Sequence, residues 1–403
     1  MTFGGTFFLL DPSFKGANGG SMTFGGGVAT AAERNGVKMK MAVSQEIPAT
    51  EAAFYNAVPI FAAATELAKI RFQATTVDTS AFFSAYSKDL SCFETQLCCQ
   101  DVLWDYYLLG PMQVDAYSKW LDQMPVDKRP RVMVGVDVYD TRWHKWLSPI
   151  SERLRSLESC LRLTTTSFTH KKTIEAQLGV QVQLMPRPLM ARKTQAFPLD
   201  QSMVALLAGR SGKNGPLVGF FTDASVMKSF HLLGDVVTRM IEASDINFAI
   251  QVRAEPVEGA CTASLAKLRL LAARHPNRVT LLGGALEHKA YKSAVELCDG
   301  IIIAYDPASH FSDTPSGTMC EALAAGTIPL VIEGTSMAKE LGIFDINIPV
   351  VARQDVASFE SLLLDFADNS KNWMNQNRAA IQEWNAFQSY ENLFEHVFEK
   401  AWS

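Results

Sequence analysis

The sequence predicts two α/β domains in tandem, each built on a parallel β-sheet. The chain has 403 residues, which exceeds the ~250–300 residues at which a single hydrophobic core stops growing. Short apolar runs alternate with stretches of helical spacing in both halves, and strands separated by helices form parallel sheets. Between the two series lies a proline-marked segment without clear periodicity, so we expect the domain boundary near residues 190–210.

The apolar runs are the expected strands. They lie at residues 7–11, 37–44, 69–74, 131–138, 161–166 and 180–185 in the first half, and at residues 217–222, 246–253, 278–282, 300–305, 328–332 and 348–352 in the second. After residue 373, apolar residues recur at helical spacing, which predicts one or two closing helices. We therefore assign residues 1–195 to an N-terminal domain, 205–375 to a C-terminal domain and 376–403 to C-terminal helices.

Composition narrows the classes of function. The formal net charge is -5, whereas a surface that binds nucleic acid needs clustered Lys and Arg. Nucleic acid is therefore not an expected partner. The seven cysteines form no Cys-x-x-Cys pair and have no histidine at zinc-ligand spacing. We expect reduced thiols and no metal site.

The sequence shows no targeting segment and no membrane span. The apolar run at residues 6–10 has no basic region before it and no A-x-A cleavage pattern after it. No window approaches the ~20 apolar residues of a transmembrane helix. We expect a soluble, cytoplasmic protein, and a peripheral contact with a membrane surface stays open.

The segment 299–341 carries the clearest chemistry. A buried strand leads into a polar loop and then into an Ala-rich helix that is expected to begin near Ser316, Gly317 and Thr318. Ligands of open α/β sheets bind at such carboxyl ends of strands. The unpaired N–H groups and the positive dipole end of this helix would then form a seat for a diphosphate.

Two acidic residues flank this helix start. Asp313 lies in the loop and Glu321 lies eight residues later, in the helix. A carboxylate can accept hydrogen bonds from two vicinal hydroxyls, so both side chains suit a polyhydroxylated ligand. An alternative is purely structural, because Thr318-x-x-Glu321 also fits a capping box, in which Glu321 serves its own helix.

The spacing of these acids, followed by the run EALAAGTIPLV from Glu321 onward, resembles the donor-binding segment of family 4 glycosyltransferases, E-x7-E with EALAAG-PVV. The resemblance covers about residues 215–345. It implies a GT-B fold with two Rossmann-like domains facing a central cleft, and helices at 376–403 that cross back to the first domain. It also implies that Glu321 binds the nucleotide ribose, Asp313 the hydroxyls of the transferred sugar, and the amides of 316–318 the distal phosphate. The first acid is Asp instead of Glu, which affects the identity of the sugar.

Residues 218–233, which include Thr222, are similar to the strand and helix opening of the same family. By this resemblance Lys228 contacts the donor diphosphate. The arginine that family members usually carry in this loop is missing between Gly219 and Lys228. Gln251 and Tyr305, at two further strand ends, are similar to a bacterial subgroup and complete the expected donor site. The structural alternative for Lys228 is a solvated lysine at a helix start.

Two stretches of the first half are further candidates. A Gly-rich loop that includes Gly19 and Gly20 follows the first apolar run and resembles the loop found there in GT-B enzymes, although an ordinary turn explains it equally well. Residues 137–146 combine acidic, basic and indole side chains after a strand, and His144 among them suits proton transfer. A surface histidine is the alternative.

The resemblance implies a retaining, metal-independent hexosyltransferase that moves a sugar from a UDP- or GDP-sugar to a hydroxyl acceptor. The acceptor would be a glycan, a lipid-linked sugar or a small molecule, as in polysaccharide biosynthesis, and no cofactor is expected. Asp in place of Glu and the missing arginine leave open a non-catalytic module that binds a nucleotide sugar or a glycan. A nucleotide-sugar epimerase is a third possibility. The first half offers no clear pair of carboxylates for the proton abstraction that an epimerase needs, which counts against it.

Overall fold

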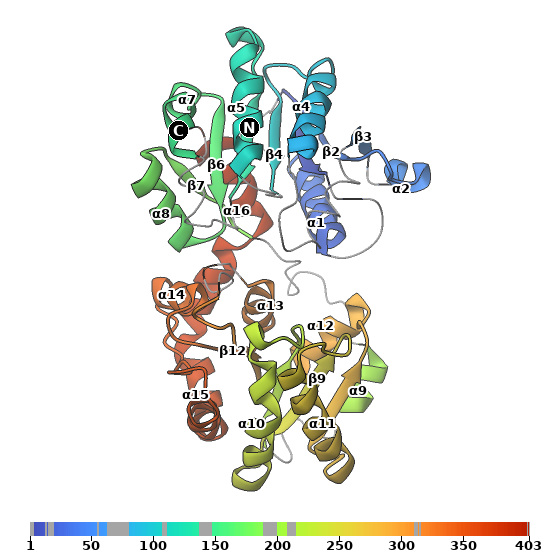
Figure 1. Ribbon diagram of the computed structural model, residues 1–403, viewed down its shortest axis with the longest axis vertical. Coiled ribbons are helices and arrows are strands. Elements are labelled where there is room, and N and C mark those ends of the chain that lie inside the picture. Colours follow the sequence, from blue (N-terminus) through green and yellow to red (C-terminus); the bar gives the residue numbers. More distant parts are fainter. Residues whose placement is uncertain are drawn as a thin grey trace. The chain divides into compact units, whose positions relative to one another are not determined.

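The computed structural model of the chain consists of two compact units (Figure 1). Unit 1 comprises Met1–Met190 and Gln388–Ser403, and unit 2 comprises Ala191–Phe387. The structure describes residues 4–12, 14, 20–54, 56–62, 80–106, 111–136, 147–187, 200–207, 215–309, 313, 316–400 and 402. Each unit contains one parallel β-sheet with helices, so the predicted fold class of two parallel-sheet α/β domains is confirmed.

The sheet of unit 1 has seven strands among the described residues, in the order β3-β2-β1-β4-β5-β6-β7, and all neighbouring strands are parallel. The strands are β1 (Phe7–Asp11), β2 (Met39–Ser44), β3 (Ala57–Phe61), β4 (Val102–Asp105), β5 (Arg131–Gly135), β6 (Leu161–Thr165) and β7 (Val182–Leu184). The strand order changes direction between β1 and β4. The carboxyl ends of these two strands therefore form a topological switch point.

Both faces of this sheet are buried. The helices are α1 (Gly20–Arg34), α2 (Ala49–Phe54), α4 (Ser80–Glu94), α5 (Pro111–Gln123), α7 (Ser151–Ser156), α8 (Phe168–Leu178) and α16 (Tyr390–Glu395), with short helical turns at Val126–Lys128, Ser148–Ile150 and His396–Lys400. Phe8 and Leu10 belong to the core under α4 and α5, whereas Phe7 and Leu9 belong to the core under α1 and α16. This alternation is the period of two that a strand imposes.

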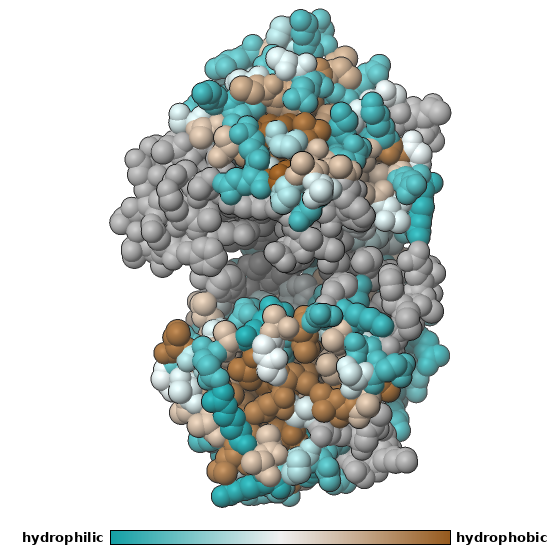
Figure 2. Space-filling model, turned by 90° about the vertical axis from the view of Figure 1, so that its right-hand side faces the viewer, coloured by the Kyte–Doolittle hydropathy of each residue, from teal (hydrophilic) through white to brown (hydrophobic). Residues whose placement is uncertain are grey.

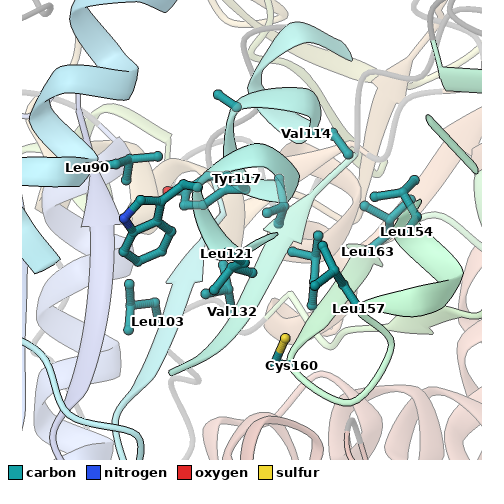
Figure 3. Packing of buried hydrophobic residues seen from close by; sticks show 14 of the residues in the cluster. Leu90, Leu103, Val114, Tyr117, Leu121, Val132, Leu154, Leu157, Cys160 and Leu163 are labelled. Atoms are coloured by element: carbon teal, nitrogen blue, oxygen red, sulfur yellow. The ribbon is translucent and has the colours of Figure 1, made fainter. Parts of the chain in front are cut away.

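The core under α4 and α5 joins helices to the central strands (Figure 3). Leu90 comes from α4, Tyr117 from α5, and Leu103 and Val132 from β4 and β5. These side chains are fully buried. Such runs of buried apolar residues on both sides of a strand are typical of parallel sheets.

The end of the chain belongs to unit 1. Phe394 of α16 packs edge-on against Phe7 of β1, with ring centroids 5.9 Å apart, and Phe398 lies 5.8 Å from the same ring. Tyr390 lies against Gly27 of α1, where a larger residue would collide with the phenol ring. The preceding helix α15 (Val356–Phe387) continues without a break through residue 376, where the sequence suggests the start of the C-terminal helices.

Unit 2 has a five-stranded parallel sheet among its described residues, in the order β10-β9-β8-β11-β12. The strands are β8 (Leu217–Phe220), β9 (Asn247–Val252), β10 (Val279–Gly283), β11 (Gly300–Ile303) and β12 (Ile328–Val331). The helices are α9 (Gln201–Leu207), α10 (Phe230–Ala243), α11 (Gly259–Arg274), α12 (His288–Leu297), α13 (Gly317–Ala325), α14 (Ser336–Ile343) and α15, and a 3-10 turn η5 spans Val226–Lys228. Helix α10 packs against α11 and α15, and α12 packs against α9 and α13. The switch point of this sheet lies between β8 and β11.

The strands predicted from the sequence differ from the structure at two unexpected strands and at two predicted runs. Strands β3 and β4 were not expected, because β3 contains Pro59 and β4 has only four residues. The run at 348–352 contributes a single bridge, between Val351 and Ile332, instead of a strand. The run at 69–74 lies outside the described residues.

The surface gives no sign of a membrane span. None of the helices in the described ranges combines the length and the apolar character that crossing a bilayer requires.

Figure 2 shows apolar, brown residues gathered on the face of unit 2 that is turned to the viewer. Exposed large hydrophobic side chains of this unit include Leu206, Val257 and Leu270. Exposed apolar residues are ordinary on folded proteins, so they carry no assignment here.

Candidate active site

The candidate site lies at the carboxyl end of the sheet of unit 2, beside its switch point. Thr222 follows β8, Gln251 lies at the end of β9, and Tyr305 follows β11. In open α/β sheets, ligands bind in the crevice outside the carboxyl ends of the strands at such a point. The topology therefore gathers residues that are more than 80 positions apart in the chain, such as Thr222 and Tyr305.

Lys228 joins two of these loops. It ends the 3-10 turn η5 directly before α10. Its Nζ lies 3.1 Å from Asp223 Oδ2 and 5.2 Å from the centre of the Tyr305 ring, a cation-π distance. The side chain is only 21% exposed, so Lys228 is not the fully solvated lysine of the structural alternative.

Ser316 begins the helix that follows β11. Its Oγ accepts a hydrogen bond from the backbone N of Met319, at 3.3 Å, and its own side chain is buried. Helix α13 therefore starts at Gly317, as the sequence predicts, with Thr318 in its first turn. The N–H groups of this turn have no partner within the helix itself.

Glu321 does not cap this helix. The residue at the capping position is Ser316 and the third helical residue is Met319, so the alternative capping box from Thr318 to Glu321 is wrong. Glu321 Oε2 instead accepts a hydrogen bond from the hydroxyl of Tyr291 on α12, at 2.5 Å. Burial raises the pKa of Tyr291, and the charge of Glu321 adds to that effect. The phenol thus stays protonated and donates to the carboxylate.

Two buried polar atoms near the strand ends lack partners among the described residues. Gln251 donates from Nε2 to the carbonyl oxygen of Gly284, at 3.1 Å, but its Oε1 accepts nothing there. The hydroxyl oxygen of Thr222 is also buried without a hydrogen-bond partner among the described residues. Both residues are at most 5% exposed. A buried polar atom without a partner costs about 1–3 kcal/mol, which points to a polar ligand at this edge of the sheet.

Asp313 lies near a lysine of α14. Its Oδ1 is 3.7 Å from Nζ of Lys339 on α14, and its side chain is 49% exposed. The structure thus brings Lys228, Tyr305 and Thr222 to one switch point, and it links Glu321 to Tyr291.

The candidates of the first half are mostly outside the described residues. Gly19 and His144 both lie outside the described residues, and Gly20 is the first residue of α1.

At the carboxyl end of the sheet of unit 1, the structure shows a hydrogen-bond network that the sequence does not reveal. Asp105 Oδ2, at the end of β4, accepts hydrogen bonds from Gln113 at 2.5 Å, from Tyr117 at 2.8 Å and from Tyr86. Burial raises the pKa of Asp105 to about 7.

Sequence reasoning also missed Tyr291 and Arg253. Tyr291 sits in a helix with an otherwise amphipathic pattern, and Arg253 follows β9 without any motif around it. No spacing rule connects Tyr291 to Glu321, or Arg253 to Asp223, since both contacts join different elements of the fold. Among the described residues, no group of three or more His, Cys, Asp or Glu side chains could hold a metal ion.

The chain shares its fold with several solved glycosyltransferase structures. Over 98% of both chains it is similar to a glycosyltransferase from Rickettsia africae, with a TM-score of 0.67 and 10% identity. An α,α-trehalose-phosphate synthase (UDP-forming) from Burkholderia xenovorans, in complex with glucose-6-phosphate, has a TM-score of 0.67 and 9% identity over 99% of this chain and 100% of that one. Sucrose-phosphate synthase from Thermosynechococcus elongatus has a TM-score of 0.62 and 12% identity over 96% of both.

These similarities define the class of fold. The two parallel-sheet α/β units have the GT-B architecture that these glycosyltransferases share. No protein-family model matches the sequence, and no curated protein sequence matches it. At identities near one residue in ten, the likeness shows the fold and leaves the activity to the residues of the site.

Proposed function

We propose that this protein is a retaining, metal-independent glycosyltransferase, similar to family 4, that transfers a sugar from a nucleotide diphosphate sugar to a hydroxyl acceptor. The observation that carries the proposal is the meeting of Lys228 and Tyr305 at the switch point of unit 2, next to the buried and unpartnered atoms of Thr222 and Gln251. The UDP-forming synthase among the structural neighbours makes a UDP-sugar the first donor to test. A GDP-sugar is the second.

In this proposal Lys228 stabilises the leaving diphosphate. The bond between the anomeric carbon and the diphosphate oxygen breaks, and the acceptor oxygen bonds to that carbon on the same face. The acceptor proton passes to the departing phosphate, which leaves as the nucleoside diphosphate. A cation and helix N–H groups aimed at the developing charge lower the barrier to this step. The Tyr305 ring, 5.2 Å from Nζ, helps to hold Lys228 at the switch point.

Glu321 binds the ribose in the same scheme. Tyr291 donates to Oε2 and thereby fixes the orientation of the carboxylate. A carboxylate accepts several hydrogen bonds at once, so it can hold the vicinal hydroxyls of a ribose while Tyr291 stays bonded. Asp313, whose carboxylate lies near Lys339, is the proposed contact of the transferred sugar. Its shorter side chain restricts which sugar it reaches.

The test compares Lys228→Ala with Lys267→Ala. Lys267 is a matched control because it also forms an ion pair, with Asp235 at 2.6 Å, but lies on α11. UDP-sugars and GDP-sugars are screened by thermal shift, since a ligand that binds the native state raises its melting temperature. Release of UDP or GDP is then measured with and without hydroxyl acceptors. We expect Lys228→Ala to lower turnover at least tenfold, because the loss of one charge-stabilising group typically costs ~2.7–4 kcal/mol in the transition state.

The same experiment separates the alternatives. Binding of a nucleotide sugar without hydrolysis or transfer would identify a non-catalytic binding module. Conversion of the donor sugar without release of nucleotide would identify an epimerase. Equal turnover in Lys228→Ala and Lys267→Ala would remove Lys228 from the mechanism.

A further inference from the structure

The carboxylate of Asp223 lies between two cations. Its Oδ2 is 3.1 Å from Nζ of Lys228, and its Oδ1 is 3.7 Å from Nη1 of Arg253. Asp223 comes from the loop after β8, whereas Arg253 directly follows β9, the neighbouring strand. Adjacent parallel strands end at the same edge of a sheet, so both cations reach one point at the carboxyl edge.

The bridge is exposed and easily replaced. Asp223 is 61% exposed and Arg253 48%. Ion pairs at such exposure contribute little to stability, because water screens them and the long side chains lose freedom. An anion with more charge and more oxygens than one carboxylate can therefore displace Asp223 from the two cations.

The charge of Arg253 also acts on Tyr291, the partner of Glu321. Burial and Glu321 raise the pKa of Tyr291, and the charge of Arg253 acts in the opposite direction. The field of Arg253 thus reaches the pair that Tyr291 forms with Glu321.

We propose that Arg253 is a second binding residue for the diphosphate of the nucleotide donor, and that Asp223 is an internal counter-ion that the diphosphate displaces. This inference rests on the proposed function. It adds Arg253, which strengthens binding of the diphosphate, and Asp223, which competes with the diphosphate for the two cations. A guanidinium binds two phosphate oxygens at once, which a lysine ammonium does not do with the same geometry. The two cations together therefore favour a nucleoside diphosphate over a single carboxylate.

The experiment titrates UDP, and separately GDP, into the full-length protein by calorimetry. Arg253→Ala is expected to weaken binding about tenfold, the size of one charge-assisted contact. Arg253→Lys keeps the positive charge but loses the bidentate geometry of the guanidinium. Its affinity for the nucleotide should therefore lie between those of the wild type and Arg253→Ala. Asp223→Asn removes the competing carboxylate and is expected to strengthen binding by about two- to fivefold, the range of an exposed ion pair. In the double variant Asp223→Asn/Arg253→Ala most of that gain should disappear.

Two matched controls accompany these variants. Arg239→Ala removes a similarly exposed arginine that pairs with Glu360, and Asp235→Asn removes a similarly exposed aspartate that pairs with Lys267. Both should bind like the wild type. Thermal unfolding of every variant checks that the fold is kept.

Each outcome decides the matter. Equal affinity of Arg253→Ala and Arg239→Ala overturns the role of Arg253 while leaving the proposed function intact. Weaker binding in Asp223→Asn overturns the counter-ion role in the same way. If the wild type binds neither UDP nor GDP, both this inference and the proposed function fail.

Discussion

Replacing Glu321 by Gln is the sharpest test of the donor site. Structurally the change is small, because Glu321 is not the cap of α13 and Gln is as good a helix former as Glu. The amide oxygen of Gln can still accept the hydrogen bond from Tyr291. What the substitution removes is the negative charge that would accept hydrogen bonds from the ribose.

The expected loss follows from that charge. A hydrogen bond to a charged group contributes ~1.5–3 kcal/mol, and each ~1.4 kcal/mol is a factor of ten in affinity. We therefore expect Glu321→Gln to weaken UDP binding by about ten- to a hundredfold. The hydrogen bond to Tyr291 becomes neutral, so stability should fall by no more than about 1 kcal/mol, which lowers the melting temperature by roughly 2–4 °C in a domain of this size.

Calorimetric titration with UDP and thermal unfolding measure the two effects side by side. Glu360→Gln is the control, because Glu360 on α15 also loses an ion pair, to Arg239 at 2.8 Å. Its affinity for UDP should not change. If Glu321→Gln and Glu360→Gln bind UDP equally well, the reasoning that gives Glu321 the ribose is refuted.

Four further expectations concern other residues. Tyr291→Phe should weaken UDP binding about three- to tenfold in the same titration, because it removes one hydrogen bond that orients Glu321. Transfer activity should survive EDTA, and a loss that manganese restores would contradict the metal-independent scheme. Phe394→Ala should destabilise unit 1 by about 3–5 kcal/mol in urea unfolding, since it removes a buried ring that packs on Phe7. Folding raises the pKa of Asp105 to about 7 from ~3.9 in the unfolded chain, so this group favours the folded state most below about pH 4. That contribution, about 4 kcal/mol at most, should disappear as the pH rises to 7 in urea titrations, and Asp105→Asn should flatten the profile.

The fold was predictable because its signal is local. Each buried strand of a parallel sheet is a short apolar run, and most of these runs stand out in the sequence. Strand β4, with the sequence VLWD, is too short to be distinguished from a turn of helix. Strand β3 carries Pro59, which argues against a strand in any single-sequence pattern. Both are recognisable only once their neighbours in the sheet are known.

The candidate site was predictable in part for the same reason. Ser316, Thr318 and Glu321 lie within one helix start and form a readable motif. The contact between Tyr291 and Glu321 instead depends on how α12 packs against α13. Packing of this kind follows from the whole fold, and no local pattern encodes it. The capping box was misread because Ser316, two residues earlier, is the better cap.

The two switch points differ in charge, and this bears on where a diphosphate can bind. In unit 1, strands β1 and β4 end in two buried carboxyl groups, Asp11 and Asp105. The charge of Asp11 raises the pKa of Asp105, because two like charges repel each other. In unit 2 the corresponding edge carries Lys228 and Arg253. A phosphate is attracted by the two cations of unit 2, while the carboxyl groups of unit 1 can form hydrogen bonds with hydroxyl groups. Among the described residues, the electrostatics thus favour an anionic ligand at the switch point of unit 2.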